Sequence, residues 1–441
     1  MSAQASRVVA SAPAPPGLPR VLAGLDPAGP LSLDRHLGLH GELPGPPSGL
    51  DLQGLVAELD RAGLRGRGGA AFPAGAKLRA VARSGRQPVV VVNAIEAEPA
   101  SSKDRLLLQR LPHLVLDGAQ LAAQALGADQ VIVCLAASAR ATAEGVQVAV
   151  DERARLFGGP RVSIAAVPDG YVSGEETALL GQLNGRPALP TLKPPYPAER
   201  GVGRRPALIN NVETLAQVAL IARHGASWFA ELGTPAEAGS ALVSLAGGVA
   251  RPGVYEIEFG TDVDALIAAA GGATVGIRAV LIGGYAGGWI DGQLRPALTL
   301  DDVSLAEHGA SLAAGIVFAL PDGACGVAET AHVASYLAAE SAGQCGPCLY
   351  GLAAIAEPVS LLARGEAPAG APERLTRWVA QVAGRGACRH PDGAARFIAS
   401  ALRVFAPEFA DHARHGPCEA CPAPALLPTP GSGRQTTGAR A

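Results

Sequence analysis

The sequence predicts an α/β protein whose first half forms a parallel sheet, followed by a small mixed β/α unit and a helical C-terminal part. Before about residue 236, apolar runs typical of buried strands alternate with helical patterns, and this alternation is typical of parallel sheets. From there to about residue 325, strand patterns are separated by glycine-rich turns. Beyond residue 326 the strand signals vanish and only helical periodicity remains.

The first unit begins with a helical pattern over residues 50–64, which runs into the glycine-rich loop RGRGGAAFPAGAK (65–77). Cys134 lies in the middle of a later strand pattern, so we interpret it as a packed core thiol. The predicted strands and the helices between them are strand 87–99, which ends in a polar loop, helix 113–126, strand 129–137, helix 141–157 and strand 161–168.

The second half contains the mixed unit and then the helices. Residues 241–272 have the pattern strand, Gly-Pro turn, strand and short helix, and further strands are predicted at 279–291 and 315–322. The segments 351–364, 373–384 and 393–413 are predicted to be helical. We therefore expect a flexible Pro/Ala-rich leader (1–28), the α/β unit (29–236), the mixed unit (237–325), the helical part (326–415) and a disordered tail (416–441).

Composition excludes several classes of function. The chain has 36 basic and 39 acidic residues, a net charge of −3, which does not suggest a nucleic-acid binder. The most apolar stretch, residues 265–290, is split by Arg278, so we expect no direct membrane insertion. The first thirty residues lack a continuous apolar core and are broken by proline, so we expect no signal peptide. Two C-x-x-C pairs among seven cysteines favour metal or redox chemistry over structural disulfides.

Polar residues follow several strand patterns. In the glycine-rich loop, Gly66, Gly68 and Gly69 could present backbone N–H groups to a phosphate, with positive charge from Lys77. The alternative is an ordinary turn. Asn93, Glu96 and Glu98 follow a strand at the end where open α/β sheets bind ligands, although loop carboxylates are also often just solvated.

Two further segments combine a polar end with a helix start. Glu175 and Glu176 open a helix after Gly174, and Asn210 and Asn211 end an apolar run before Thr214. These side chains could cap the helices, or they could bind ribose hydroxyls or an amide.

In this order, the motifs resemble one family: the NADH-oxidising, FMN-containing subunit of respiratory complex I, shared with NAD-linked hydrogenases and formate dehydrogenases. The resemblance covers about residues 30–412 and implies a Rossmann-like FMN/NADH domain, a β-grasp (SLBB, ubiquitin-like) module and an iron–sulfur-binding helical bundle. The matching segments are GLRGRGGAAFPAGAK, VVNAIEAEPASSKDR, PHLVLDGAQLAA, GYVSGEETALL, LKPPYPAERGV, NNVETLA, GGVARPGVYE and ESAGQCGPC.

The resemblance also implies roles for matching positions, with FMN and NADH as cofactors and no side chain needed as acid or base. Two flat aromatic side chains would stack on NADH. The FMN pocket would comprise Gly66, Gly68, Gly69, Lys77, Asn93, Glu96, Tyr171, Glu175, Asn210, Asn211 and Thr214. Phe72, Glu98, Glu176, Lys193 and Tyr196 would face NADH.

The sequence departs from the family pattern near the flavin. Ile95 stands where the family has an acidic residue, Ala97 where it has glycine, and Ala80 where a second aromatic residue follows the lysine. These departures weaken the NADH side of the resemblance more than the FMN side.

The family's [4Fe–4S] cluster uses three cysteines in C-x-x-C-x-x-C and a fourth about forty residues later. Cys345, Cys348 and Cys388 match three of these, and Ala342 stands at the first position. Four interpretations are open: a cluster on three cysteines, as [4Fe–4S] with an outside ligand or as [3Fe–4S]; rescue by Cys325 or His390; zinc; or no metal. The tail pair Cys418 and Cys421 could bind a second metal, dock a partner, form a local disulfide or be inert.

The resemblance predicts flavin-dependent oxidation of NADH, with single electrons leaving through an iron–sulfur centre to a small iron–sulfur or ferredoxin-like protein. We expect a cytoplasmic subunit, either free or peripheral to the inner face of the membrane through a membrane oxidoreductase complex. Two alternatives are a degenerate, non-catalytic scaffold and an FMN-binding carrier that does not use NADH.

Overall fold

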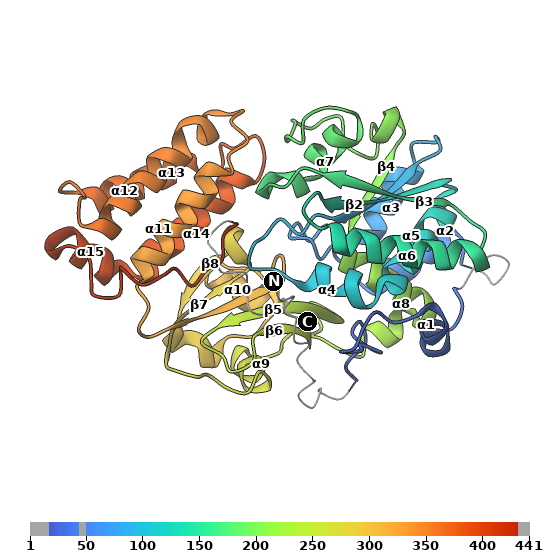
Figure 1. Ribbon diagram of the computed structural model, residues 1–441, viewed down its shortest axis with the longest axis horizontal. Coiled ribbons are helices and arrows are strands. Elements are labelled where there is room, and N and C mark those ends of the chain that lie inside the picture. Colours follow the sequence, from blue (N-terminus) through green and yellow to red (C-terminus); the bar gives the residue numbers. More distant parts are fainter. Residues whose placement is uncertain (1–16, 44–49, 431–441) are drawn as a thin grey trace, which may run out of the picture.

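The computed structural model describes residues 17–43 and 50–430 of the 441-residue chain. It confirms the predicted fold class: a parallel sheet with helices, a second mixed sheet, and a helical C-terminal part. Figure 1 shows the first sheet on the right, the C-terminal helices on the left and the second sheet below and between them. Among the described residues, the helices are all too short or too polar to cross a bilayer.

The first sheet has the strand order β3-β2-β1-β4, and all of its neighbouring strands are parallel. Its strands are β1 (Val89–Ala94), β2 (Gln130–Ala136), β3 (Arg161–Val167) and β4 (Ala207–Asn211). Its helices are α1 (Leu33–His40), α2 (Leu52–Arg61), α3 (Ala74–Ala82), α4 (Lys103–Arg110), α5 (Pro112–Leu126), α6 (Arg140–Leu156), α7 (Glu176–Leu183) and α8 (Val212–Phe229), with short 3-10 turns η1 (Tyr171–Gly174) and η2 (Val202–Arg204).

Alternate residues of the buried strands serve two different cores. Val90 and Val92 of β1 pack in a cluster with residues of α2, α3, α5 and α8. Val89 and Val91 point to the other face, where they pack with Leu179 of α7. Cys134 lies in this second core and is fully buried, which confirms its interpretation as a packed thiol. Burial on both faces explains why the strands appear as continuous apolar runs in the sequence.

The second sheet has the order β6-β5-β9-β7-β8, with β5 and β9 parallel and the other pairs antiparallel. One of its faces packs on α9, and the other face packs on the C-terminal helices through Leu281 and Phe318. Its elements are β5 (Ser240–Gly247), β6 (Gly253–Glu258), α9 (Val263–Ala269), β7 (Ile277–Ile282), η3 (Gly284–Ala286), β8 (Gly288–Asp291), η4 (Gly292–Ala297), α10 (Asp302–Glu307) and β9 (Ile316–Pro321).

The C-terminal part is helical throughout and shares one core with the second sheet. Trp289 of β8 is fully buried against Phe397 and Phe405, so the sheet fixes the position of the helices. The helices are α11 (Gly326–Ala339), a π-helical turn η5 (Pro347–Gly351), α12 (Leu352–Arg364), α13 (Ala371–Val382), α14 (His390–Val404) and α15 (Ala406–His415).

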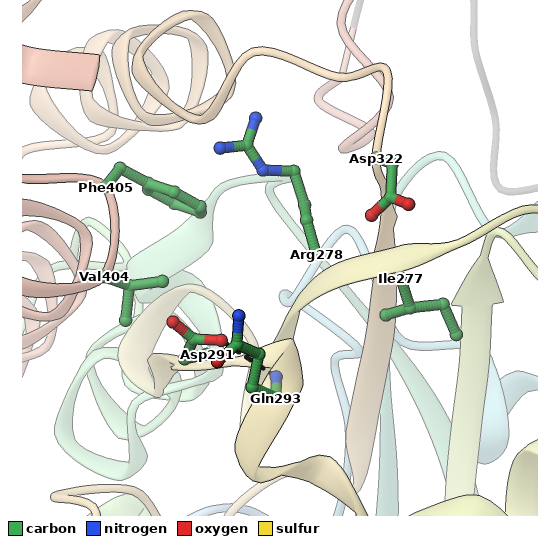
Figure 2. A pocket seen from close by; sticks show the side chains of 7 residues that line it. All are labelled: Ile277, Arg278, Asp291, Gln293, Asp322, Val404 and Phe405. Atoms are coloured by element: carbon green, nitrogen blue, oxygen red, sulfur yellow. Dashed lines mark hydrogen bonds between the residues drawn. The ribbon is translucent and has the colours of Figure 1, made fainter. Parts of the chain in front are cut away.

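A hollow of about 270 Å³ lies between the second sheet and the residues that join α14 to α15 (Figure 2). The Arg278 side chain extends through it toward Phe405 and α15, where its guanidinium pairs with Glu408. The hollow shares no residue with the predicted flavin, NADH or cluster positions. Its lining residues are Ile277, Arg278, Asp291, Gln293, Asp322, Val404 and Phe405.

Two expectations about the chain ends are wrong for the described residues. Part of the predicted flexible leader is packed: Val21 is fully buried, and the N–H groups of residues 20–22 donate to the Glu256 carboxylate over 2.9–3.0 Å. Part of the predicted disordered tail is packed too, because Leu427 is 1% exposed against the C-terminal core. In both places apolar residues inside Pro-rich sequence find a core to bury in. Residues 1–16 and 431–441 lie outside the described residues.

Gly118 allows α5 and α8 to pack at backbone distance. A Cβ built at Gly118 would lie 1.9 Å from the carbonyl oxygen of Leu215, which no side chain could tolerate without backbone movement. We expect Gly118→Ala to destabilise the fold by about 1–3 kcal/mol because it overpacks this contact. Urea unfolding measures the change.

Gly145→Ala is the matched control. Gly145 lies within α6, and a Cβ there would meet nothing within 4 Å. It should stabilise by about 0.5–1 kcal/mol through helix propensity alone. Equal effects of the two substitutions would contradict the close packing of α5 on α8.

Candidate functional site

Predicted site residues meet at the carboxyl edge of the first sheet. β1 and β4 are parallel neighbours in a register that pairs Asn93 with Asn211 and Val92 with Asn210. The Asn93 amide donates to the carbonyl of Gly174 over 2.8 Å, which ties the strand end to the turn before α7. Asn211 caps α8 by accepting from the N–H of Glu213. The two segments that looked ambiguous in the sequence therefore form one edge.

The glycine-rich loop lies against this edge. The N–H of Arg67 donates to the hydroxyl of Thr214 over 2.8 Å, and a Cβ at Gly68 would lie 3.1 Å from the Asn211 Cβ. Gly69 has a φ of +97°, which favours glycine. Among the described residues, the exposed N–H groups of Gly68 and Gly69 find no hydrogen-bond acceptor. They are free to bind an anion, so the loop fits the phosphate of a flavin mononucleotide.

A buried ion network fixes the loop, and the sequence alone did not predict it. The Lys103 ammonium lies 2.7 Å from Glu213 Oε2 and 3.1 Å from Asp104 Oδ1, and it donates to the Arg67 carbonyl over 3.1 Å. Burial alone would lower the pKa of Lys103, but the two carboxylates raise it above its ordinary value, so the ammonium stays charged. The sequence signal for this network is the Lys-Asp pair at 103 and 104, which follows the polar loop after β1.

A second set of charges lies where β4 meets α7. Lys77 donates to the Ile209 carbonyl over 2.7 Å and lies 3.6 Å from Glu176. Lys193 lies 2.5 Å from Glu176 and 3.4 Å from Glu175. Burial lowers the pKa of Lys77, against the opposing effect of Glu176. Four residues predicted from three separate motifs are therefore brought together.

Glu96 and Ile95 have structural roles. The Glu96 carboxylate accepts from the Ser101 hydroxyl and from the N–H groups of Asp104 and Arg105, so it caps α4. Burial raises its pKa, and the neighbouring Asp104 adds to that. Ile95 is 9% exposed and belongs to the core on the α7 side of the sheet. This packing accounts for an apolar residue where the family has an acidic one.

Glu98 lies where the three parts of the chain meet. Its Oε2 accepts from the Tyr171 hydroxyl over 2.9 Å and from the N–H of Tyr285, in the second sheet's part of the chain, over 3.0 Å. Tyr171 in turn contacts the rings of Tyr336 and His390 in the C-terminal helices. Burial raises the pKa of Glu98 to about 7, although the hydrogen bonds from Tyr171 and Tyr285 oppose this rise.

The predicted stacking residues are accessible. Phe72 and Tyr196 are each 52% exposed. The Phe72 carbonyl accepts from the N–H of Gly66 over 2.9 Å, which fixes the backbone of Phe72 within the glycine-rich loop. The roles of all these residues toward FMN and NADH remain predictions.

The predicted cluster cysteines converge on the C-terminal helices. Cys348 is buried in the π-helical turn η5, a distortion common at functional sites, and Cys345 lies just before it. Burial raises the pKa of Cys388, and the nearby Cys348, Glu175 and Cys345 add to that rise. Cys388 lies two residues before α14, which packs on η5, so the three cysteines lie in one region of the C-terminal helices.

The proposed rescue by Cys325 is wrong, because its sulfur lies 3.4 Å from Cys421 and 3.8 Å from His412, in a different cluster of side chains. His390 is near Cys388 in sequence, and its Nε2 is hydrogen-bonded to the Leu337 carbonyl over 2.9 Å, which leaves its buried Nδ1 without a partner among the described residues, so rescue by His390 stays a prediction. Because position 342 is alanine, Cys345, Cys348 and Cys388 have no fourth thiolate from the C-x-x-C-x-x-C motif.

Comparison with known families defines the class of protein. The chain matches the Nuo51 FMN-binding domain over residues 59–220, the SLBB domain over 242–292, and the NADH-ubiquinone oxidoreductase-F iron-sulfur binding region over 328–412. These regions fall on the first sheet, the second sheet and the C-terminal helices described above. They define an oxidoreductase subunit with an FMN-binding domain and an iron–sulfur binding region.

The chain belongs to the family of NADH-quinone oxidoreductase F subunits. It is 33% identical over 379 residues to the second NADH-quinone oxidoreductase F subunit of Rhizobium meliloti (strain 1021), covering 82% of this chain and 90% of that protein. It is 32% identical over 373 residues to the NADH-quinone oxidoreductase F subunit of Rhodobacter capsulatus, covering 81% and 86%. Since these relatives are subunits, the family works together with other proteins.

A solved structure agrees with this assignment. An NAD+-reducing [NiFe]-hydrogenase in its H2-reduced state matches with a TM-score of 0.77 and 31% identity. The match covers 83% of this chain and 63% of the hydrogenase chain, so this chain spans less than two thirds of that longer chain.

Glu98 makes stability depend on pH. Its ordinary pKa is 4.5 and its folded pKa is about 7, so the folded state binds more protons between these values and stability falls as pH rises through that window. We expect Glu98→Gln to relieve the cost of the buried charge. At about pH 8, the substitution should raise the free energy of unfolding by up to roughly 3 kcal/mol relative to the wild type, and the melting temperature should rise with it. At about pH 4 it should have little effect.

The control is Glu144→Gln, at an exposed position on α6. It should leave the melting temperature unchanged at both pH values. A Glu98→Gln effect of equal size at both would show that the carboxyl group does not titrate in this window.

Proposed function

We propose that this chain oxidises NADH with bound FMN and passes single electrons to an iron–sulfur centre on its C-terminal helices. The observation that carries this proposal is the contact of Tyr171, a predicted flavin residue, with the ring of His390, two residues after Cys388; the two ring centroids lie 5.3 Å apart. The predicted flavin residues and the predicted cluster cysteines thus belong to neighbouring parts of the fold. Bound FMN would supply the chemistry, because flavins accept a hydride and can release electrons singly.

The residues of this chain would bind and orient the flavin. The free N–H groups of Gly68 and Gly69 would bind its phosphate, and the Lys103 network would hold their loop against Asn211. Asn93, Asn210 and Asn211 offer polar side chains at adjacent strand ends, where hydrogen bonds to the flavin would set its orientation. Glu96 would act indirectly, because it caps α4 and so helps to fix Lys103 and Asp104.

The exposed aromatic residues would bind the nicotinamide nucleotide. Phe72 and Tyr196 provide flat faces, and the Lys193–Glu176 pair provides a donor and an acceptor beside Lys77. Burial raises the pKa of Glu98 to about 7, so near neutral pH its carboxyl group would be able to donate a hydrogen bond as well as accept one.

For the electron-transfer site, we propose a cluster held by the three thiolates of Cys345, Cys348 and Cys388. The acceptor is then a small iron–sulfur or ferredoxin-like protein that docks near η5, where Leu349 and Tyr350 are exposed. A partner of this kind could link the chain to a membrane oxidoreductase complex at its cytoplasmic side.

The stacking role is tested with Phe72→Ala and Tyr196→Ala. An aromatic stacking contact contributes about 0.5–1.5 kcal/mol, so each substitution should raise KM for NADH roughly 2- to 10-fold while the bound FMN stays the same. Steady-state rates of NADH oxidation with an artificial electron acceptor give KM, and the flavin absorbance of the purified protein gives its FMN content. Tyr350→Ala removes another exposed tyrosine and should leave this KM unchanged. A wild-type chain that takes up no FMN would contradict the proposed function, and bound FMN that NADH cannot bleach would favour a carrier.

The cluster is tested by restoring the missing thiol. Ala342→Cys should convert the site to a four-thiolate cluster with about four iron atoms per chain and greater stability in air. Iron and sulfide analysis with EPR after anaerobic purification makes the measurement. Ala380→Cys adds a thiol at an exposed position on α13 and should not change the iron content. Less than about one iron per chain in both the wild type and Ala342→Cys would rule out the cluster.

A further inference from the structure

The geometry points to a second metal site, built by Cys325, His412, Cys418 and Cys421, that holds one tetrahedral Zn²⁺ ion and fastens residues 416–430 to the C-terminal helices. Within the described part of the chain, this is the one group of three or more possible ligands whose donor atoms all lie within 4.8 Å of one another. Three cysteines and one histidine are a ligand set typical of structural zinc. The site shares no residue with the predicted flavin or cluster positions and does not depend on the proposed function.

The distances between the ligand atoms fit a single ion. The Cys325 and Cys421 sulfurs lie 3.4 Å apart, and the Cys418 and Cys421 sulfurs 3.7 Å apart. His412 Nε2 lies 3.8 Å from both Cys325 and Cys421. Zinc–sulfur bonds of about 2.3 Å place the corners of a tetrahedron about 3.8 Å apart, so these separations are its edges. The same sulfurs are too far apart for a disulfide, whose bond is about 2.05 Å long.

The histidine is oriented to act as a ligand. Its Nδ1 lies 3.2 Å from the carbonyl oxygen of Leu362, and only a protonated nitrogen can donate to a carbonyl. The lone pair is therefore on Nε2, which faces the Cys325 and Cys421 sulfurs and, with no ion bound, accepts a long hydrogen bond of 3.4 Å from the N–H of Cys418. This is the usual arrangement of a metal-binding histidine, in which a second hydrogen bond fixes the tautomer and the ring. His412 and Cys325 are both 4% exposed.

Other contacts hold the two buried ligands in place. Glu408, one turn before His412 on α15, accepts from the N–H of Gly326, the residue after Cys325, over 2.9 Å. Arg278 pairs with the same carboxylate and donates to the carbonyl of Ala324 over 2.6 Å, and Figure 2 shows this arginine reaching across from the second sheet. The positions of Cys325 and His412 are thus set by a network that does not include the tail.

The tail completes the site and gains a fixed course. After Cys421, the N–H groups of Leu426 and Leu427 donate to Glu329 of α11 over 2.7 and 2.9 Å, and Leu427 is buried. The Pro428 carbonyl then accepts from the buried hydroxyl of Tyr285, in the second sheet's part of the chain. A metal at the start of this segment would link α11, α15 and the second sheet.

The test measures metal in the full-length chain, purified without chelators. We expect about one zinc per chain, and Cys418→Ser should weaken zinc binding at least tenfold, because even residues behind the ligands matter by about 10- to 100-fold. Cys418 is exposed, so its substitution should leave the fold intact. Loss of zinc should also speed proteolysis within residues 416–430. Cobalt added to the zinc-free chain should show the absorption of a tetrahedral thiolate site.

His415→Gln is the matched control, because His415 is the last residue of the same helix and is not in the group. It should keep its zinc, and iron content should be the same in Cys418→Ser and the wild type. The proposal is overturned if Cys418→Ser binds zinc as tightly as the wild type. It is also overturned if the wild type binds iron at these ligands. A wild type that binds no metal and instead forms a Cys418–Cys421 disulfide would overturn it as well.

Discussion

The candidate site depends on one buried ammonium group. Lys103 is 2% exposed and has Glu213, Asp104 and the carbonyl of Arg67 as partners. Glu213 also accepts from the N–H of Leu242 over 2.9 Å, so the same network joins the glycine-rich loop, α4, α8 and the first strand of the second sheet. Breaking such a network by removing one partner typically costs about 3–5 kcal/mol, because the remaining charges stay buried. Because Lys103 binds the carbonyl of Arg67, the loop is fixed without using the N–H groups of Gly68 and Gly69, which stay available to a ligand.

The second sheet contacts both the candidate site and the C-terminal helices. The N–H of Tyr285 donates to Glu98 and the N–H of Leu242 donates to Glu213, while side chains on one face of the sheet share a core with the C-terminal helices. Tyr171 completes the arrangement, since it binds Glu98 and packs on Tyr336 and His390. The second sheet therefore helps to set how the predicted flavin edge and the predicted cluster cysteines lie relative to each other.

Much of this architecture could be predicted from the sequence, because buried parallel strands and amphipathic helices leave strong apolar patterns. The grouping of Lys77, Glu175, Glu176 and Lys193 could not be derived from spacing, and it came from the family resemblance. The buried role of Lys103 was missed because a lysine beside an aspartate usually marks a solvated surface. The packing of residues 20–22 and of Leu427 was missed for a related reason: proline-rich composition hides short apolar segments whose partners are far away in the chain.

The seven cysteines can now be divided by environment. Cys134 is a core residue, and its pKa of about 12, raised by burial, leaves it an inert thiol. Three cysteines lie at or near η5, at the predicted cluster positions, and three lie with His412 at the base of the tail. Among the described residues, only the second set brings its donor atoms within 4.8 Å of one another, as a single ion requires, whereas an iron–sulfur cluster binds its thiolates through several iron atoms. The odd number of cysteines therefore does not imply a thiol left over from a set of disulfides. Cys325, which the sequence offered as a possible fourth cluster ligand, lies in the proposed zinc site instead.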